Sequence, residues 1–464
     1  MATQIIVNPV TRIEGHAKIV LDLDDQGRVE KGHLKVLEIR GFEKLLEGME
    51  LFKMPLITAR LCGVCPAAHH LAAVDAIEAG LSVEPPRDAA LLRELLYMGH
   101  ILHSHALSCF VLSGPDVLLG VGSPAATRNV FEVLRLAPEV AKKVLRLRSM
   151  GQKTVETVGG RGVHPVTVVP GGITSRPSDA ELETMAGWGE EALGLIEELG
   201  GVLRSKLGEM ATLRDAVPME LPALGFSDGG ALSFLRGDLV AADPGGEVRR
   251  FPRAAYAENL VEHVMPGSYM KSVRLRGAPE QSYFVGPLAR LLVNERLTTP
   301  RADALARELR DRIRARPTAL DYIEARLVEL VFAAERMAQI PGEVGQGPLR
   351  TPAAAREGRY VGGVEAPRGI LIHDYRADAE GRLTEVNLIV ATQNNYDAMD
   401  ATVTRLARHY LPAGDDNLLM NGMEFALRCF DPCLSCATHV AGRMPLEVEL
   451  RCGESVRTIT RRAP

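Results

Sequence analysis

A chain of 464 residues with 46 % hydrophobic and 24 % charged residues is long enough for a large core and has an ordinary globular composition. The formal net charge of −5 argues against a basic nucleic-acid surface, and we expect neither a secretion signal nor a membrane-spanning helix, because no run of about 18 apolar residues occurs. The seven cysteines are few and odd in number, which favours reduced thiols in the cytoplasm over a disulfide framework.

Strands are expected near the N-terminus and long helices in the middle of the chain. Strand-like patterns occur over residues 5–7, 17–23 and 33–39. Apolar residues at helical spacing predict helices over 87–112, 128–158, 179–209 and 302–340, the last interrupted at Pro317. Short strands and loops are expected over 216–300, a strand over 386–391 and a helix over 399–410. The sequence therefore predicts an α-rich α+β fold with a long central helix bundle and small peripheral sheets.

Four of the seven cysteines form two C-x-x-C pairs, Cys62 with Cys65 and Cys433 with Cys436. Two thiolates at this spacing can bind one ion, and four soft thiolates suit zinc, an iron–sulfur cluster or nickel. Residues 66–432 lie between the pairs, whereas zinc ribbons usually bring their pairs together within about 15–20 residues. On spacing alone, a structural zinc site and a redox metal are equally open.

The residues around the pairs favour the redox metal. R-x-C-G-x-C-x-x-x-H over 60–69 and D-P-C-x-x-C-x-x-H over 431–439 resemble the paired motifs of nickel–iron hydrogenase large subunits. Segments 10–16, 40–43, 105–116 and 365–369 are similar to further motifs of that family, whereas residues 175–340 match little beyond helical character. One departure is Ala391, because family members often carry proline before the hydroxyl residue that follows. The resemblance implies the fold shared by hydrogenase large subunits and the quinone-site subunit of complex I.

The resemblance also implies a nickel ion bound by all four paired cysteines. Cys62 and Cys433 would be terminal ligands, while Cys65 and Cys436 would bridge to iron. The iron would carry cyanide and carbon monoxide ligands, and dihydrogen would be cleaved heterolytically at this centre. Soft thiolates suit a nickel ion that changes redox state.

Two functional side chains are expected beside the metals. Glu14 resembles the family's first proton carrier; the alternative is that it pairs with Arg12 or caps backbone amides. Arg368, in an Ala-Pro-Arg-Gly segment, would lie above the open metal face. Asp116 and Asp431 resemble the acids that hold this arginine by charge-assisted hydrogen bonds.

Further polar groups are expected around the centre. Thr392 and the backbone near Pro367 resemble hydrogen-bond donors to the cyanide ligands. His69 resembles a residue that hydrogen-bonds a bridging sulfur and tunes it. Glu43 and His439 resemble ligands of a separate magnesium or iron site near the C-terminus.

The remaining histidines and cysteines of note are interpreted as structural or are given no role. His100, His103 and His105 lie at helical spacing, which favours a core polar network over a metal site. Cys109, Cys429 and Cys452 fall outside both motifs.

A short tail follows the second motif. Residues 1–439 would form the hydrogenase domain, in several lobes with both metal-binding ends packed together, and 440–464 would be an extension. In the family, a dedicated protease removes such a tail after nickel-insertion chaperones have loaded the metal. The alternating residues 446–450 predict a strand in this tail.

Partners are expected because the chain has no further cysteine cluster for an iron–sulfur relay. A small iron–sulfur subunit would take the electrons. Similarity around residues 43 and 105–119 favours the soluble multimeric group, of NAD-reducing or methyl-viologen-reducing type. Flavin and NAD would bind diaphorase-type subunits, because no G-x-G-x-x-G follows a strand here.

Two other functions share these features. A hydrogen sensor would keep the same metals and signal instead of turning over. A complex I-like quinone-site subunit would share the fold but lack the four cysteines. A zinc-binding scaffold would retain the cysteines alone.

Overall fold

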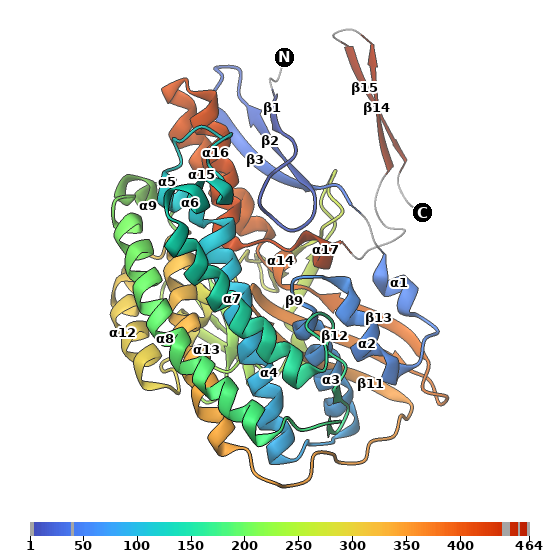
Figure 1. Cartoon of the computed structure of the whole chain (residues 1–464). Coiled ribbons are helices and arrows are strands. Elements are labelled where there is room, and N and C mark those ends of the chain that lie inside the picture. Colours follow the sequence, from blue (N-terminus) through green and yellow to red (C-terminus); the bar gives the residue numbers. More distant parts are fainter. Residues whose placement is uncertain (1–3, 39–40, 439–445, 453–454, 462–464) are drawn as a thin grey trace.

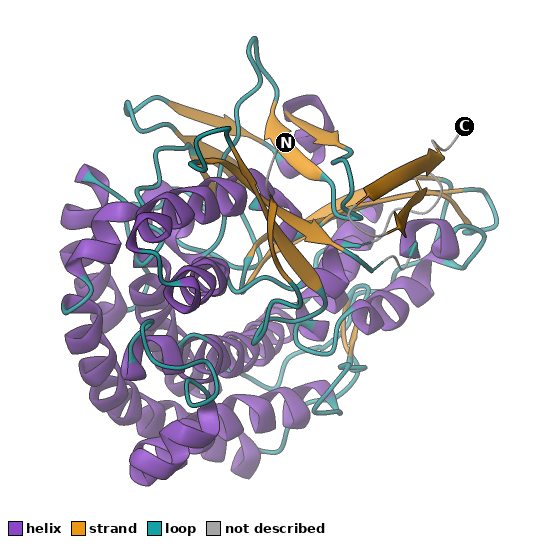
Figure 2. Cartoon of the chain, turned by 90° about the horizontal axis from the view of Figure 1, so that it is seen from above, coloured by secondary structure: helices purple, strands orange, loops and turns teal. Residues whose placement is uncertain are grey.

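A central layer of long helices dominates the computed structural model, which describes residues 4–38, 41–438, 446–452 and 455–461 (Figures 1 and 2). α4 (Arg87–Ala106) packs against α7 (Pro138–Gly159) and α13 (Asp321–Glu343), and α8 (Asp179–Gly208) packs against both α7 and α13. α12 (Pro300–Ala315) adds a further layer on α13. The expected α-rich α+β fold with a central bundle is therefore confirmed.

Local sequence signals explain where these helices begin and break. Ser178 and Glu181 form a reciprocal capping box at the start of α8. The helix expected over 128–158 is two helices, α6 (Val130–Leu136) and α7, because Ala137 leaves the helical region at φ −139° and ψ 65° directly before Pro138. The expected break near Pro317 separates α12 from α13.

Small antiparallel sheets surround the bundle. β1 (Gln4–Val7), β2 (Ala17–Leu23) and β3 (Val29–Val36) form the N-terminal sheet, so the third strand begins and ends earlier than the expected 33–39. The other strands form one sheet each of β6–β8 and β11–β13 and three pairs: β4 (Val168–Val169) with β5 (Gly172–Ile173), β6 (Ala223–Ser227), β7 (Asp238–Ala242), β8 (Val248–Phe251), β9 (Leu260–His263) with β10 (Ser272–Leu275), β11 (Gly358–Ala366), β12 (Gly369–Ala377), β13 (Leu383–Ile389), and β14 (Leu446–Cys452) with β15 (Ser455–Arg461).

Shorter helices connect these layers and carry much of the sequence discussed below. α4 continues into a π-helical segment over Leu107–Leu112, a local widening that is frequent at functional sites. The remaining α-helices are α1 (Phe42–Leu46), α2 (Met54–Thr58), α3 (Pro66–Leu81), α5 (Gly114–Leu119), α9 (Ala211–Ala216), α10 (Tyr256–Asn259), α11 (Pro287–Val293), α14 (Ala391–Asn394), α15 (Tyr396–Tyr410), α16 (Asp416–Phe430) and α17 (Leu434–Ala437).

Packing of the two chain ends on the same face positions the site. α3 lies on β11 and β12, while α15 packs on both β3 and α16. Glu14 forms a parallel backbone bridge with Cys433, so a segment after β1 lies against the segment after α16. Gly15 permits this contact, because its φ is +85° and an added Cβ would come within 2.7 Å of the Leu434 Cβ.

One helical stretch, Arg87–Leu119, is long and apolar enough to cross a membrane by length and composition alone. However, 83 % of its most apolar window is buried inside the protein. We interpret it as a core helix, because α4 packs against α7 and α13 over its length. The expected tail strand over 446–450 lies within β14, whose partner β15 also belongs to the tail.

Candidate metal centre

The two cysteine pairs converge in the interior, each at the start of a helix. Cys65 is the residue directly before α3, and Cys433 directly precedes α17. The Sγ atoms of Cys62 and Cys433 lie 3.1 Å apart, those of Cys65 and Cys436 3.2 Å, and those of Cys433 and Cys436 3.1 Å. All four side chains are buried. The fold therefore joins motifs from opposite ends of the sequence, as the sequence predicts.

The four sulfurs fit a single metal centre. Metal–thiolate bonds are about 2.3 Å long, so two sulfurs on one ion can be at most roughly 4.6 Å apart. The four Sγ atoms lie within 4.8 Å of one another, and the closest pairs are well inside this limit. Among the described residues, this is the one group of three or more Cys, His, Asp or Glu side chains found close enough together to hold a metal.

Mutual hydrogen bonding divides the thiols by acidity. Hydrogen bonds from Cys433 and Cys436 hold the pKa of Cys62 well below its usual value. The backbone amides of Val64 and Cys65 also donate to the Cys62 Sγ, each at 3.2 Å. The pKa of Cys433 is raised well above normal by its hydrogen bonds to the other thiols, and burial raises that of Cys436. In the metal-free chain, the first thiolate therefore forms at Cys62.

Glu14 contacts the cluster directly. Its Oε2 accepts hydrogen bonds from the Cys433 thiol at 3.2 Å and from the backbone amide of Ser435 at 2.9 Å. The carboxylate therefore caps a backbone amide and, in the same geometry, lies within proton-transfer distance of a metal-binding sulfur. Arg12 points elsewhere, toward Asp116.

Arg368 lies at the tip of the two-residue turn between β11 and β12, with Ala366 paired to Gly369. Its Nε donates to the Asp431 carbonyl at 2.7 Å and its Nη2 to Asp431 Oδ1 at 3.1 Å. Burial acts to lower the pKa of Arg368, but the negative charges of Asp431 and the cysteines outweigh this effect and raise it. The guanidinium is therefore a permanent charge held beside the sulfurs.

The expected contact between Asp116 and Arg368 is wrong. Asp116 instead binds three other guanidinium groups, those of Arg12, Arg128 and Arg428, at 2.7–3.1 Å. The π-helical segment ends just before α5, and this geometry turns the Asp116 carboxylate toward the N-terminal segment and α16.

Ser104 is the second side chain near Arg368, and sequence reasoning missed it. Its Oγ lies 3.5 Å from the Arg368 Nη1. It stands on α4 between His103 and His105, so its helical position was the one available signal.

A small cavity of about 10 Å³ opens beside the thiols, on the order of one water molecule. Arg368, Thr392 and His69 line it together with Cys65, Cys433 and Cys436 and four apolar residues, Ala366, Leu371, Val390 and Ala391. The space suits groups of one or two heavy atoms at the metals, which agrees with diatomic ligands and dihydrogen.

Thr392, His69 and Pro367 lie near the centre in different ways. Thr392 Oγ1 accepts a hydrogen bond from the Cys433 amide at 2.9 Å and faces the cavity. His69 shares a hydrogen bond through Nδ1 with His373 at 3.2 Å, and burial lowers the pKa of His69 to about 4, so the ring is neutral. The Pro367 carbonyl accepts a hydrogen bond from Arg290 at 3.1 Å.

The proposed second metal site is described only on one side. Glu43 Oε1 accepts a hydrogen bond from the Leu388 amide at 3.0 Å, which holds α1 against β13. His439 lies outside the described residues.

The other candidate residues behave as core groups. His105 shares a 2.7 Å hydrogen bond with Glu329, and the His100 and His103 rings lie 5.3 Å apart. Burial raises the pKa values of Cys109 and Cys429 to about 12, so both thiols stay protonated. The side chain of Cys452 lies outside the described part of the chain.

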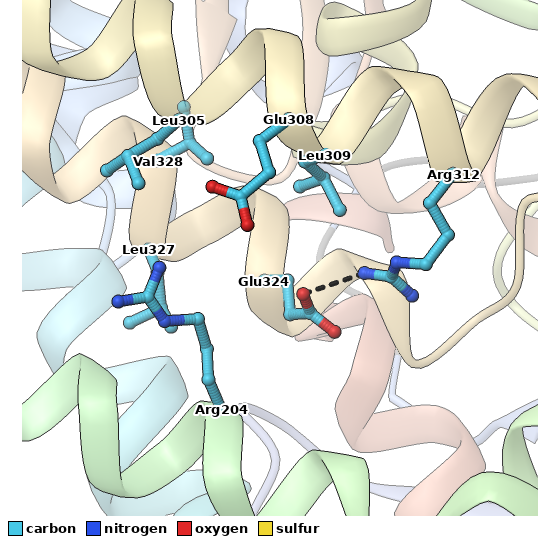
Figure 3. A pocket seen from close by; sticks show the side chains of 8 residues that line it. All are labelled: Arg204, Leu305, Glu308, Leu309, Arg312, Glu324, Leu327 and Val328. Atoms are coloured by element: carbon cyan, nitrogen blue, oxygen red, sulfur yellow. Dashed lines mark hydrogen bonds and ion pairs between the residues drawn. The ribbon is translucent and has the colours of Figure 1, made fainter.

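A second cavity, of about 90 Å³, lies on the surface between α8, α12 and α13 (Figure 3). Leucine and valine side chains line it beside charged residues, and Glu324 accepts a hydrogen bond from Arg312 at 2.7 Å. Its eight lining residues, all in the described ranges, include neither cysteine nor histidine. It therefore lacks the chemistry of the first site.

This fold and this buried four-thiol site define a metalloenzyme subunit whose centre is suited to redox chemistry. Residues 40–127 match the nickel-dependent hydrogenase family, and residues 4–39 match a HoxL-like family.

Two curated relatives align over nearly the whole chain. The F420-non-reducing hydrogenase of Methanothermobacter marburgensis contains a polypeptide that is 35 % identical over 94 % of each chain. The HoxS subunit beta of the NAD-reducing hydrogenase of Cupriavidus necator is 34 % identical over 97 % of each chain. The solved structure of an NAD⁺-reducing [NiFe]-hydrogenase in the H₂-reduced state matches with a TM-score of 0.90 and 35 % identity, over 95 % of this chain and 100 % of that one.

The chain belongs to the nickel-dependent hydrogenase large-subunit family. The expected family and fold are thereby confirmed. It is an enzyme subunit, and the four converging cysteines form its Ni-Fe site. The structural zinc site left open by spacing is set aside, as is a complex I-like subunit without cysteine ligands.

Proposed function

We propose that this chain cleaves dihydrogen reversibly and heterolytically, with Cys62 and Cys433 as terminal nickel ligands and Cys65 and Cys436 as bridges to iron. When bound, the Ni-Fe centre, with cyanide and carbon monoxide on iron, supplies the cleavage chemistry. The observation that carries the proposal is the convergence of four buried thiols from opposite ends of the chain on one point.

Glu14 takes the proton away from the centre in this proposal. Its Oε2 lies 3.2 Å from the Cys433 Sγ, so a proton on that sulfur has an acceptor already in hydrogen-bond contact. The Ser435 amide holds the carboxylate in this orientation. Glu14 is only partly buried, which gives the proton a way onward to solvent.

Arg368 and Thr392 shape the space above the metals. A fixed guanidinium beside a small, largely apolar cavity can polarise a bound molecule, because a preorganised charge needs no reorganisation during the reaction. The hydroxyl of Thr392 faces the same cavity and can donate to a cyanide ligand, as can backbone groups near Pro367. His69 would tune the adjacent sulfur through its neutral ring.

Maturation completes a second site. Glu43 and His439 would bind magnesium or iron once a protease has cut after His439 and removed residues 440–464. Nickel-insertion chaperones would load the metal before cleavage. Intact-mass measurement of the large subunit from active enzyme should give a chain ending at His439; normal turnover by a chain ending at Pro464 would contradict this.

Electrons leave through partner subunits. A small iron–sulfur subunit would receive them and pass them to a flavin- and NAD-binding diaphorase in the cytoplasm, with NAD(P) or another soluble acceptor at the end. The NAD-reducing relative and the NAD⁺-reducing solved structure support this arrangement. The F420-non-reducing relatives support a different soluble acceptor, and copurifying subunits distinguish the two.

The direct test is hydrogen-dependent reduction of a viologen dye by the purified holoenzyme. The proposal predicts sustained dye reduction under hydrogen and none under argon. Binding of hydrogen without turnover would identify a sensor instead, and absence of both in a fully metallated enzyme would contradict the proposal.

A further inference from the structure

A second arginine, Arg290 on α11, is fully buried directly behind the turn that carries Arg368. A guanidinium has five N–H donors, and the structure engages all five. Nε and Nη2 bind the two oxygens of Glu329, each at 2.7 Å, and Nη1 binds Glu365 Oε2 at 2.7 Å. The remaining two donors bind backbone carbonyls.

Those two carbonyls belong to the residues immediately before Arg368. Arg290 Nη1 donates to the Ala366 carbonyl at 3.0 Å, and Nη2 donates to the Pro367 carbonyl at 3.1 Å. The turn has little room to move, because Gly369 has a φ of +133° and an added Cβ there would come within 2.2 Å of Val285 Cγ2. Arg290 thus fixes the backbone on one side of Arg368.

The counter-ions of Arg290 are themselves fully held. Glu365 Oε1 accepts the Phe226 amide at 2.7 Å, and Glu329 Oε2 also accepts from His105 Nε2 at 2.7 Å. Burial alone would raise the pKa of Glu329, but the charge of Arg290 and the hydrogen bonds lower it to about 2. The network therefore ties α4, α11, α13 and β11 to one guanidinium.

Such a network is a costly way to gain stability. Removing charges from water is unfavourable, and well-packed apolar residues often stabilise a core equally well. A fully satisfied buried network can instead specify one geometry. The geometry specified here is that of the turn whose tip carries the charge beside the thiols.

We propose that Arg290 is a positioning residue for the hydrogenase reaction: it fixes the Ala366 and Pro367 carbonyls and thereby aims Arg368 at the metal centre. The inference rests on the proposed function of Arg368. Asp431 holds the guanidinium end of Arg368, and Arg290 holds its backbone end.

Arg290→Lys tests this with the charge retained. An ammonium has three donors, so it can pair with both carboxylates but cannot serve five acceptors. Arg93→Lys is the matched control, because Arg93 is also buried, binds both oxygens of Glu78 and holds the carbonyls of Val169 and Gly172. Both variants lose the same kind of contact, but only Arg290 supports the Arg368 turn.

The measurement is a double-mutant cycle in the holoenzyme with Arg368→Lys. Arg290→Lys should lower hydrogen-dependent viologen turnover roughly tenfold with nickel content unchanged, a loss expected for a displaced charge. In the Arg368→Lys background the same change should have almost no further effect. Infrared bands of the iron-bound diatomic ligands should shift in Arg290→Lys and stay fixed in Arg93→Lys.

An equal loss in both backgrounds, or unshifted infrared bands, would overturn the positioning role. If Arg290→Lys does not accumulate as folded protein, the pair Arg290→Gln with Glu329→Gln removes one charge of each sign and leaves the net charge of the network unchanged. The same dependence on Arg368 is required of it. Failure of the proposed function would look different, since the unaltered holoenzyme itself would then lack hydrogen turnover.

Discussion

Replacing Glu14 by glutamine separates proton transfer from assembly of the site. Glutamine is nearly the same size, and its amide oxygen can still accept the Ser435 amide at the 2.9 Å position. It cannot take up a proton from Cys433, which the carboxylate contacts at 3.2 Å. The substitution therefore removes one chemical capacity and preserves most of the geometry.

The two effects differ in size. At most about one net hydrogen bond is lost, so the free energy of unfolding should fall by no more than about 1 kcal/mol. Loss of a positioned proton acceptor typically slows a reaction by about 10²–10⁴-fold, which corresponds to roughly 3–5 kcal/mol of activation free energy. The kinetic effect should clearly exceed the structural one.

The assays are hydrogen-dependent viologen reduction, H/D exchange, nickel content and thermal unfolding of the holoenzyme. Glu14→Gln should lose turnover and exchange while keeping nickel and nearly all of its stability. Glu38→Gln is the control, because Glu38 lies in the same N-terminal region and pairs with His16 at 2.6 Å on the surface. Near-normal turnover in Glu14→Gln would place the proton path elsewhere, and loss of nickel would make the residue structural.

Three further predictions follow from the buried groups. Arg368→Lys should retain nickel but lose about 10²-fold in turnover, because a lysine cannot make both contacts to Asp431, and full activity would make the arginine structural. Cys65→Ala should abolish nickel binding, whereas Cys109→Ala should cost only about 1 kcal/mol of stability and leave nickel in place; equal nickel loss in both would refute the ligand assignment. The pKa of Glu329 is about 2 in the folded chain against an ordinary 4.5, so its stabilising contribution is complete above pH 4.5 and is lost as the pH falls toward 2. Denaturation at a series of pH values should show this loss, and Glu329→Gln should flatten it; an unchanged slope would contradict the pairing with Arg290.

Periodicity along the sequence was sufficient to predict the central helices, because each buries an apolar face over many turns. It failed where one residue decides the local backbone. Pro138 ends one helix and begins the next, although apolar residues continue on both sides at helical spacing. The tail strand was predicted from alternation, whereas its pairing with β15 follows from structure alone.

The metal ligands could be predicted because the motifs are local and chemically unusual. The residues that orient Arg368 could not. Arg290 lies in the part of the sequence that matches no motif, and nothing in its neighbours distinguishes a buried arginine from a solvated one. Asp116 was assigned the wrong partner for the same reason, since three guanidinium groups from distant segments meet at its carboxylate only in the folded chain.

Metal analysis of the active enzyme tests the central claim most directly. The four converging thiols should hold about one nickel per large subunit with iron beside it, and changing any one of Cys62, Cys65, Cys433 or Cys436 to alanine should remove the nickel. Active, hydrogen-oxidising protein that contains zinc and no nickel would contradict the account.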